Sequence, residues 1–589
     1  MNGEAGPRRT DTGAPASTPA KPLGRALRPR NIVIATVAFV IVAIASILLL
    51  PGILVDHWLS GITTDSTTIR LSLTNAAQTV LFILGGAVGL VGVALSLSRH
   101  GLELEIAAAD RAKEERRIGE LSQQRQIEAE RELRSRFADA VSLLSDPEKV
   151  STRQAGVYAL AALADDWHEF GRFDETAVCV DVLCGYLRSR WDPQSPQAEG
   201  ERAIRSAGFS VIGSHLRASA GRPSWHGARM NLRGALIDFD VDMAGIVLPA
   251  TSVLDLKNAR LTGGLVDFRD IQMTGGSLLL TGAALHGSTL LLARADVGSG
   301  LADFSGVTIG KGVIEFSEAS LTGGTLDFSG FGLDGGAVLL NGMEMSAGEL
   351  RFESGRMSGG TLDFHETKFT GGTVGFSQAR LHSGDIDFRF ADLAGGTIDF
   401  KDARFDGATI NFNYTRFSGS AVDLTTAEFD SGEIDFTGAK FGGGTVDFGF
   451  ARFGGANVNF GLSSVIGGVV NFSGAKFNGG EVSFRYASFE GGRVNYREAE
   501  FNTGTVSFSD ANFRGSTVSF VEAILRGNVV SFAGTNFSSG KVNFTGTAFR
   551  GDPDLFAHAR FSGARDSAGA KLRDPRNGPM QAGLGPPRR

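Results

Sequence analysis

A large apolar residue recurs at every twelfth position through the C-terminal half of this 589-residue chain, from Leu256 to Phe544. A second apolar residue follows each of these anchors after five residues, so the spacing alternates between five and seven. A strict period of this kind is typical of repeat architectures, in which each unit buries its apolar side against its neighbours. We predict six residues in the middle of the array to be core residues: Phe436, Phe441, Phe448, Phe453, Phe472 and Phe477.

The repeat unit reads V-x-F-x-x-A-x-F-x-G-G-x. The alternation in V-x-F and A-x-F predicts two short strands per unit with inward apolar side chains, and the Gly-, Ser-, Asn- and Asp-rich residues between them favour turns. We therefore predict a β-solenoid over residues 252–551. One coil could contain one unit or two. We favour 24 residues, because two-residue turns would otherwise have to cross roughly 10 Å between two faces that both carry phenylalanine.

Two charge-free apolar runs precede the repeats and predict transmembrane helices over residues 31–55 and 77–98. About 20 helical residues cross a hydrocarbon core of roughly 30 Å. Basic residues flank both outer ends, whereas the short loop 56–76 contains a single arginine, so both termini are expected in the cytoplasm. Gly85 and Gly89 either let a second copy of the helix approach closely or are simply tolerated there.

The other segments are assigned by composition. The basic arm 1–30 and the tail 552–589 are predicted to be disordered. Residues 99–145 predict a charged juxtamembrane helix that could self-associate as a weak coiled coil. Residues 146–217 predict a small helical bundle, and residues 218–251 are assigned to an N-terminal cap of the solenoid. Two cysteines in the bundle are expected to be buried thiols, because their number and spacing suit neither a disulfide framework nor a zinc site: Cys179 and Cys184.

Two segments of the array, ADLAG at 391–395 and ANFRG at 511–515, match the pattern A-(D/N)-(L/F)-x-G. They resemble units of the pentapeptide-repeat family, and the order of segments along the chain is similar to that of bacterial membrane-anchored members. The resemblance implies an all-β right-handed β-helix with Leu or Phe pointing to its axis, preceded by two transmembrane helices and a small α-helical region. It also implies a location in the bacterial inner membrane. The seven-residue step departs from the family's regular coil.

Nothing in the repeats indicates an enzyme. The array is not interrupted by an inserted loop on which a catalytic site could be built, and its Gly-rich tracts recur as turns without the lysine of a phosphate-binding loop. His286, His365 and His382 lie in different units, and Asp165, Asp166 and His168 are explained as surface charge at a helix end. We expect no catalytic residue, cofactor or metal. The net charge of −7 and the absence of a basic stripe in the folded part indicate no nucleic-acid partner.

The residue before the anchor is often acidic and predicts an outward ladder of carboxylates. Its members are Asp387, Asp399, Asp423, Asp435 and Asp447. The ladder is either a solvated face or an anionic surface, and some proteins of the similar family protect DNA gyrase by mimicking DNA. We predict a membrane-anchored scaffold or protein-interaction module with unknown protein partners besides the lipid bilayer. The alternatives are a topoisomerase-protecting DNA mimic and an exported surface rod.

Overall fold

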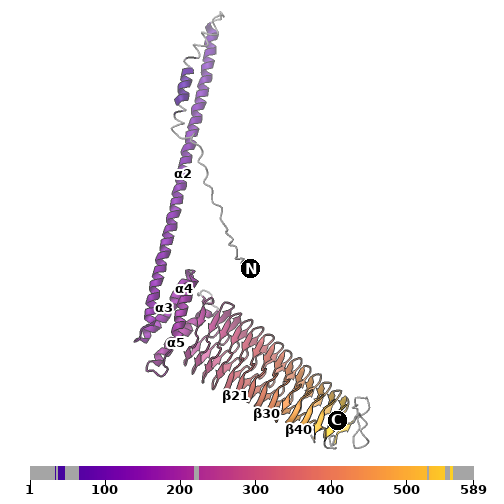
Figure 1. The fold of residues 1–589 in the computed structure, drawn as a ribbon. Coiled ribbons are helices and arrows are strands. Elements are labelled where there is room, and N and C mark those ends of the chain that lie inside the picture. The colour runs from indigo at the N-terminus through magenta and orange to yellow at the C-terminus, as the bar shows by residue number, and fades with distance from the viewer. Residues whose placement is uncertain are drawn as a thin grey trace, which may run out of the picture. The chain divides into compact units, whose positions relative to one another are not determined.

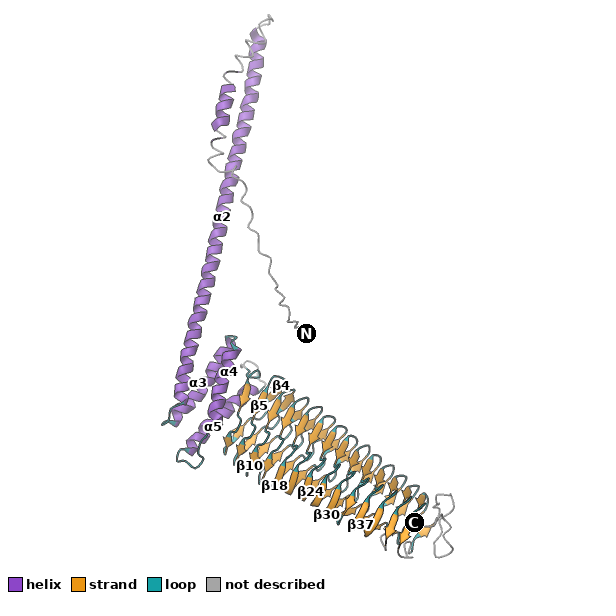
Figure 2. Cartoon of the chain, viewed as in Figure 1, coloured by secondary structure: helices purple, strands orange, loops and turns teal. Residues whose placement is uncertain are grey.

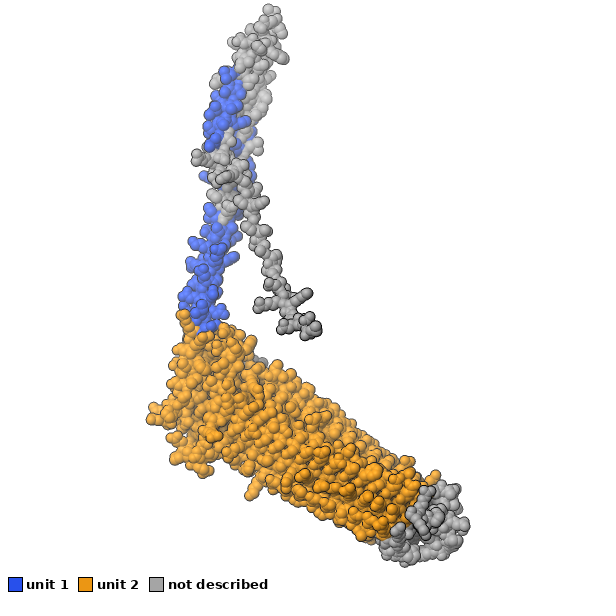
Figure 3. Space-filling model, in the orientation of Figure 1, with its two compact units in different colours: residues 1–130 blue, residues 131–589 orange. Residues whose placement is uncertain are grey.

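The computed structural model describes residues 34, 37–46, 49, 66–217, 224–526, 530–550 and 558–561 (Figures 1 and 2). The chain divides into two compact units, residues 1–130 and 131–589, which Figure 3 distinguishes by colour. The predicted arm 1–30, the first part of the predicted loop, 56–65, and the end of the tail, 562–589, lie outside the described residues.

The first unit is dominated by helix α2 (Ser66–Leu144), which continues into the second unit. All described side chains from Ile106 to Glu128 are exposed. Glu, Arg, Gln and Ala dominate this stretch, and its scattered apolar residues, such as Ile118, form no continuous stripe that could be buried. An added Cβ at Gly85 or Gly89 would meet no atom within 4 Å, so self-association through these glycines stays a prediction.

The structure contradicts the two predicted transmembrane helices and, with them, the predicted location in a bacterial inner membrane with both termini in the cytoplasm. Within the described residues, no helix combines the length and the apolar character that crossing a bilayer requires. Of the first apolar run, only residues 34, 37–46 and 49 are described as helical. The second run forms no helix of its own, because it is the beginning of α2, whose later turns carry the charged sequence.

The second unit begins with the end of α2 and three shorter helices, α3 (Val150–Glu169), α4 (Phe173–Arg188) and α5 (Ala198–Leu216). Each helix has an apolar side that is buried against the others. Cys179 and Cys184 are buried free thiols, as predicted. Burial raises the pKa of each thiol to about 12.

A buried ion network joins these helices around Glu201. Its carboxylate accepts hydrogen bonds from Arg205 Nε (2.7 Å), Arg153 Nη1 (2.7 Å) and the Tyr186 hydroxyl (3.0 Å). Only 1% of the Arg205 side chain is exposed, and its guanidinium also donates to the Leu187 carbonyl oxygen at 2.6 Å. Burial lowers the pKa of Arg205 and raises the pKa of Tyr186 to about 12. The network holds α3, α4 and α5 together through one carboxylate.

The solenoid consists of short parallel strands in three sheets. Sheet 1 contains β1 (Arg229–Asn231), β5 (Val253–Asp255), β9 (Ser277–Leu279), β13 (Leu301–Asp303), β17 (Thr325–Asp327), β20 (Glu349–Arg351), β23 (Thr373–Gly375), β26 (Thr397–Asp399), β29 (Ala421–Asp423), β32 (Thr445–Asp447), β36 (Val469–Asn471), β39 (Arg493–Asn495), β42 (Thr517–Ser519) and β46 (Lys541–Asn543).

Sheet 2 is the widest and bends along its middle. It contains β2 (Leu236–Ile237), β3 (Val241–Asp242), β6 (Arg260–Leu261), β7 (Leu265–Asp267), β10 (Ala284–Leu285), β11 (Thr289–Leu291), β14 (Thr308–Ile309), β15 (Val313–Glu315), β18 (Gly332–Leu339), β21 (Arg356–Asp363), β24 (Arg380–Asp387), β27 (Arg404–Asn411), β30 (Glu428–Asp435), β33 (Arg452–Phe453), β34 (Asn457–Asn459), β37 (Lys476–Ser483), β40 (Glu500–Ser507), β43 (Ile524–Arg526), β44 (Val530–Ser531) and β47 (Ala548–Arg550). The bend falls at glycines such as Gly384, whose φ of +101° accompanies a shift of register within β24.

Sheet 3 completes each coil. It contains β4 (Val247–Pro249), β8 (Gln272–Thr274), β12 (Asp296–Val297), β16 (Ser320–Leu321), β19 (Glu344–Met345), β22 (Lys368–Phe369), β25 (Asp392–Leu393), β28 (Arg416–Phe417), β31 (Lys440–Phe441), β35 (Ser464–Val465), β38 (Ser488–Phe489), β41 (Asn512–Phe513), β45 (Asn536–Phe537) and β48 (Arg560–Phe561).

One coil contains 24 residues, which confirms the favoured alternative. Strand partners in neighbouring coils are 24 residues apart, as in Thr397↔Ala421 of sheet 1, and residues 229–543 make about 13 turns. Figure 1 shows the strands of successive coils lying side by side along the solenoid. Each coil uses two sequence units, one starting on sheet 1 and the other in the second half of sheet 2. The hand of the coil stays a prediction.

The predicted core residues line the interior. Phe436, Phe441, Phe448, Phe453, Phe472 and Phe477 are each at most 2% exposed. Rings one coil apart stack in parallel columns, with 4.6 Å between the centroids of Phe436 and Phe460 and 4.7 Å between those of Phe448 and Phe472. The interior therefore consists of continuous aromatic columns, which explains why the period must be kept so strictly.

The first coil begins at β1, so the segment 218–251, assigned to a cap by sequence, contributes strands β1 to β4. Helices α4 and α5 cover this coil. Arg188 Nη1 donates to the Asn231 carbonyl oxygen at 2.8 Å, and Arg202 forms an ion pair of 2.7 Å with Asp238. The ring of Phe239 packs against Trp191 and Phe209. These contacts satisfy an edge that would otherwise be open to pairing with another chain.

Candidate interaction surface

The five carboxylates of the predicted ladder lie on two different sheets. Asp387 and Asp435 belong to sheet 2, whereas the other three are direct register partners on sheet 1: Asp399, Asp423 and Asp447. The split follows from the coil length, because positions 12 residues apart fall on opposite halves of a 24-residue coil.

Each ladder carboxylate caps its own turn. The Oδ1 atom of Asp423 accepts the backbone N–H of Thr425 at 2.9 Å, and the same contact measures 2.8 Å from Asp447 to Gly449 N–H. Asp387, Asp399 and Asp435 make the equivalent bond, and all five side chains are half-buried. Farther along the column, Asn471 Nδ2 donates to Asp447 Oδ1 at 2.8 Å. Asp and Asn at this position therefore have a structural use as turn caps.

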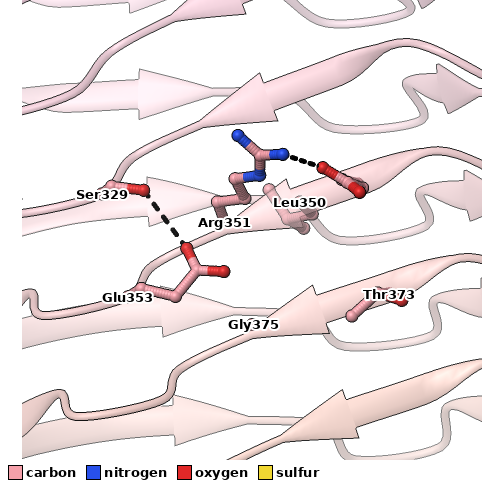
Figure 4. A pocket seen from close by; sticks show the side chains of 7 residues that line it. Ser329, Leu350, Arg351, Glu353, Thr373 and Gly375 are labelled. Atoms are coloured by element: carbon pink, nitrogen blue, oxygen red, sulfur yellow. Dashed lines mark hydrogen bonds and ion pairs between the residues drawn. The ribbon is translucent and has the colours of Figure 1, made fainter.

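A polar hollow of about 360 Å³ opens on sheet 1 where the ladder column is interrupted by Arg351 and Gly375 (Figure 4). A Cβ at Gly375 would lie 2.4 Å from Glu353 Oε1, so this glycine makes room for the Glu353 side chain. The Glu353 carboxylate accepts a hydrogen bond from Ser329 Oγ at 3.2 Å, and Arg351 is paired with Glu349. The hollow is open to solvent and its charged groups already have partners, so it offers little to a ligand.

The acidic residues once considered as metal ligands near His168 turn to separate partners. Asp166 pairs with Arg136 at 2.6 Å, and the ring of His168 packs edge-on against Phe173. Asp165 instead contacts His215 Nε2 at 3.1 Å and accepts a hydrogen bond from Trp225 Nε1 at 3.1 Å. Across the described part of the chain, no group of three or more His, Cys, Asp or Glu residues could hold a metal ion.

The structure reveals a surface feature that the sequence analysis missed. Four large side chains project from the corner between sheets 2 and 3 and are 51–62% exposed; we call them the corner strip: Phe390, Tyr414, Leu462 and Tyr486. Each occupies the turn position two residues after an anchor, where the backbone φ is 56–59°. Gly438 takes this position in the central coil of the strip. A search for apolar residues at this turn position with a step of 24 would have found the strip.

The corner strip is ordered by contacts between coils. The rings of Phe390 and Tyr414 stack with 5.4 Å between centroids and 7° between planes. The guanidinium carbon of Arg485 lies 4.9 Å from the centre of the Tyr486 ring. With neighbouring strands about 4.8 Å apart, four coil steps give the strip a length of about 19 Å.

Comparison with known proteins yields no relative. No protein-family model, no curated protein and no solved structure matches the sequence. The chain is a repeat β-solenoid. Its function has to be argued from this surface.

Proposed function

We propose that the solenoid is a non-catalytic binding scaffold that presents its flat faces and corners to protein partners. The observation that carries the proposal is the uninterrupted register. From Val253 to Asn543, paired strands of successive coils are 24 residues apart without an inserted loop. Such a frame is rigid and repetitive, and it lacks the loops on which catalytic pockets are usually built.

We also propose that the repeat is a variant of the pentapeptide-repeat type. Two family-like positions support this reading, because Ala391 and Leu393 of the ADLAG segment are both fully buried in the coil interior. The solenoid itself requires only the 24-residue stride, so the relationship rests on the similarity of these segments.

Site-specific photo-cross-linking in cells tests the scaffold proposal. A photoreactive amino acid would replace one exposed residue on each sheet: Arg493 on sheet 1, Glu481 on sheet 2 and Lys440 on sheet 3. We expect discrete protein adducts from at least one position. If none of the three positions gives a discrete adduct while the protein is folded, the scaffold proposal is wrong.

A further inference from the structure

The corner strip is built at a conformational cost. A positive φ disfavours residues with a side chain, and large apolar residues are uncommon there. At other coils the same corner carries Glu366, Asp510 or glycine, which suit a solvated turn. Phe390, Tyr414, Leu462 and Tyr486 are neither favoured by this backbone nor buried in the chain. Strained residues that are also exposed and apolar indicate a role outside the fold of the single chain.

Two unpaired cations lie beside the centre of the strip. Arg416 and Lys440 are exposed register partners on neighbouring strands of sheet 3, and neither forms an ion pair within the described residues. Arg416 has Asp392 as its other register neighbour, whereas Lys440 has only Ser464 on its far side. Like charges placed directly opposite each other destabilise a sheet. An anion bound across them would remove this repulsion.

We propose that the corner strip docks an acidic segment of a partner protein that also carries apolar side chains. Its apolar side chains cover Phe390, Tyr414 and Leu462, and its carboxylates lie over Arg416 and Lys440. Two cations are too few to hold a nucleic acid, which is bound by neutralising many phosphates. The strip provides apolar contact area instead, and aromatic and arginine residues are enriched in protein–protein interfaces. This inference rests on the proposed binding role and assigns it a surface.

The test selects ligands from a phage-displayed library of random peptides on the full-length protein, with counter-selection on the Tyr414→Ser variant. We expect the enriched peptides to combine Asp or Glu with Leu, Phe or Trp. A synthetic peptide of this kind should bind about tenfold more weakly to Tyr414→Ser and to Lys440→Glu, a loss of about 1.4 kcal/mol each. Replacing its acidic residues by lysine should restore binding to an Arg416→Glu/Lys440→Glu variant.

Two matched controls separate the strip from general stickiness. Phe450 is 66% exposed at the same turn position on another corner, and Lys541 is an exposed lysine of sheet 1. Phe450→Ser and Lys541→Glu should leave peptide binding within about twofold of the wild type. Circular dichroism checks that all variants are folded.

The proposal is overturned if no peptide is enriched, if the enriched peptides lack acidic residues, or if Phe450→Ser weakens binding as much as Tyr414→Ser. Equal competition by a single-stranded oligonucleotide would identify a general anion site. A dimer in mass photometry that Tyr414→Ser abolishes would make a second copy the occupant, and loss of co-sedimentation with anionic vesicles would make it a lipid surface. Photo-adducts on other faces would keep the scaffold proposal even if the strip binds nothing.

Discussion

The ring of Tyr414 lies over Gly438, the residue at the same turn position one coil later. A Cβ added to Gly438 would be 2.6 Å from Cε1 of that ring, which is closer than real Cβ contacts come. Phe450 and Gly474 repeat the relationship at another corner, also with 2.6 Å to Cε1. The choice of residue at one turn therefore restricts the choice at the next turn of the same column.

Replacing Gly438 by alanine should destabilise the solenoid more than the same change at Gly330. Both glycines have a positive φ, of 69° and 67°, but an added Cβ at Gly330 meets no atom within 4 Å. We expect Gly330→Ala to lower the free energy of unfolding by about 1–2 kcal/mol through the backbone alone. Gly438→Ala should lose about 1–3 kcal/mol more through the clash. Urea denaturation measures both, and equal losses would show that the ring moves aside freely.

Tyr496→Phe should stabilise the protein. The hydroxyl of Tyr496 is buried in an aromatic column between Phe472 and Phe520 and has no hydrogen-bond partner in the described structure. Removing a buried, unpaired hydroxyl should raise the free energy of unfolding by about 1–3 kcal/mol. The control is Tyr486→Phe, because the Tyr486 side chain is exposed. A lower denaturation midpoint for Tyr496→Phe would show that the hydroxyl is bonded, for example to an internal water.

Glu201→Gln should unfold the helical bundle at a lower temperature. The change removes the carboxylate shared by Arg153 and Arg205 and leaves two guanidinium groups in a buried site. Removing one partner of a buried ion pair costs about 3–5 kcal/mol. Glu199→Gln on the exposed side of the same helix serves as the control and should change stability little. A melting temperature of Glu201→Gln equal to that of the control would contradict the importance of the network.

Alkaline pH should destabilise the helical bundle through its two thiols. Cys179 and Cys184 have ordinary pKa values of 9.0 when unfolded and about 12 when folded. Between these values the unfolded chain has lost protons that the folded chain keeps, so stability falls as pH rises from 9 to 12. The Cys179→Ala/Cys184→Ala variant should lose less stability between pH 8 and pH 10 than the wild type. A parallel loss in both proteins would assign the alkaline effect to other groups.

Replacing Asp399, Asp423 and Asp447 by asparagine should leave stability nearly unchanged. Asparagine keeps the side-chain oxygen that caps each turn and removes the repulsion between stacked carboxylates, whereas alanine should cost about 0.5–1.5 kcal/mol per lost hydrogen bond. Thermal denaturation compares the two sets. A gyrase supercoiling assay completes the experiment: inhibition by the wild type that the Asn variant abolishes would favour the DNA-mimic alternative over a structural ladder.

The sequence predicted the interior of the solenoid far better than its exterior. Phe436 and Phe453 could be placed in the core because apolar residues with a strict period and an alternation of two have only one side on which to be buried. The ladder was treated as a single row, although it divides between Asp435 on sheet 2 and Asp447 on sheet 1. The neighbours of an outward residue depend on the length of the coil, which the spacing alone left at 12 or 24.

The 12-residue period by itself determined that the chain forms stacked coils with aromatic columns inside, because burial of apolar side chains acts on each unit in the same way. Only the tertiary structure decided which outer residues meet. It placed Arg416 beside Lys440 and brought Tyr414 to Gly438 across 24 residues, and it joined Asp165 to His215 across 50. Such contacts depend on how the coil closes and where it bends, and neither is encoded in the period of the inward residues.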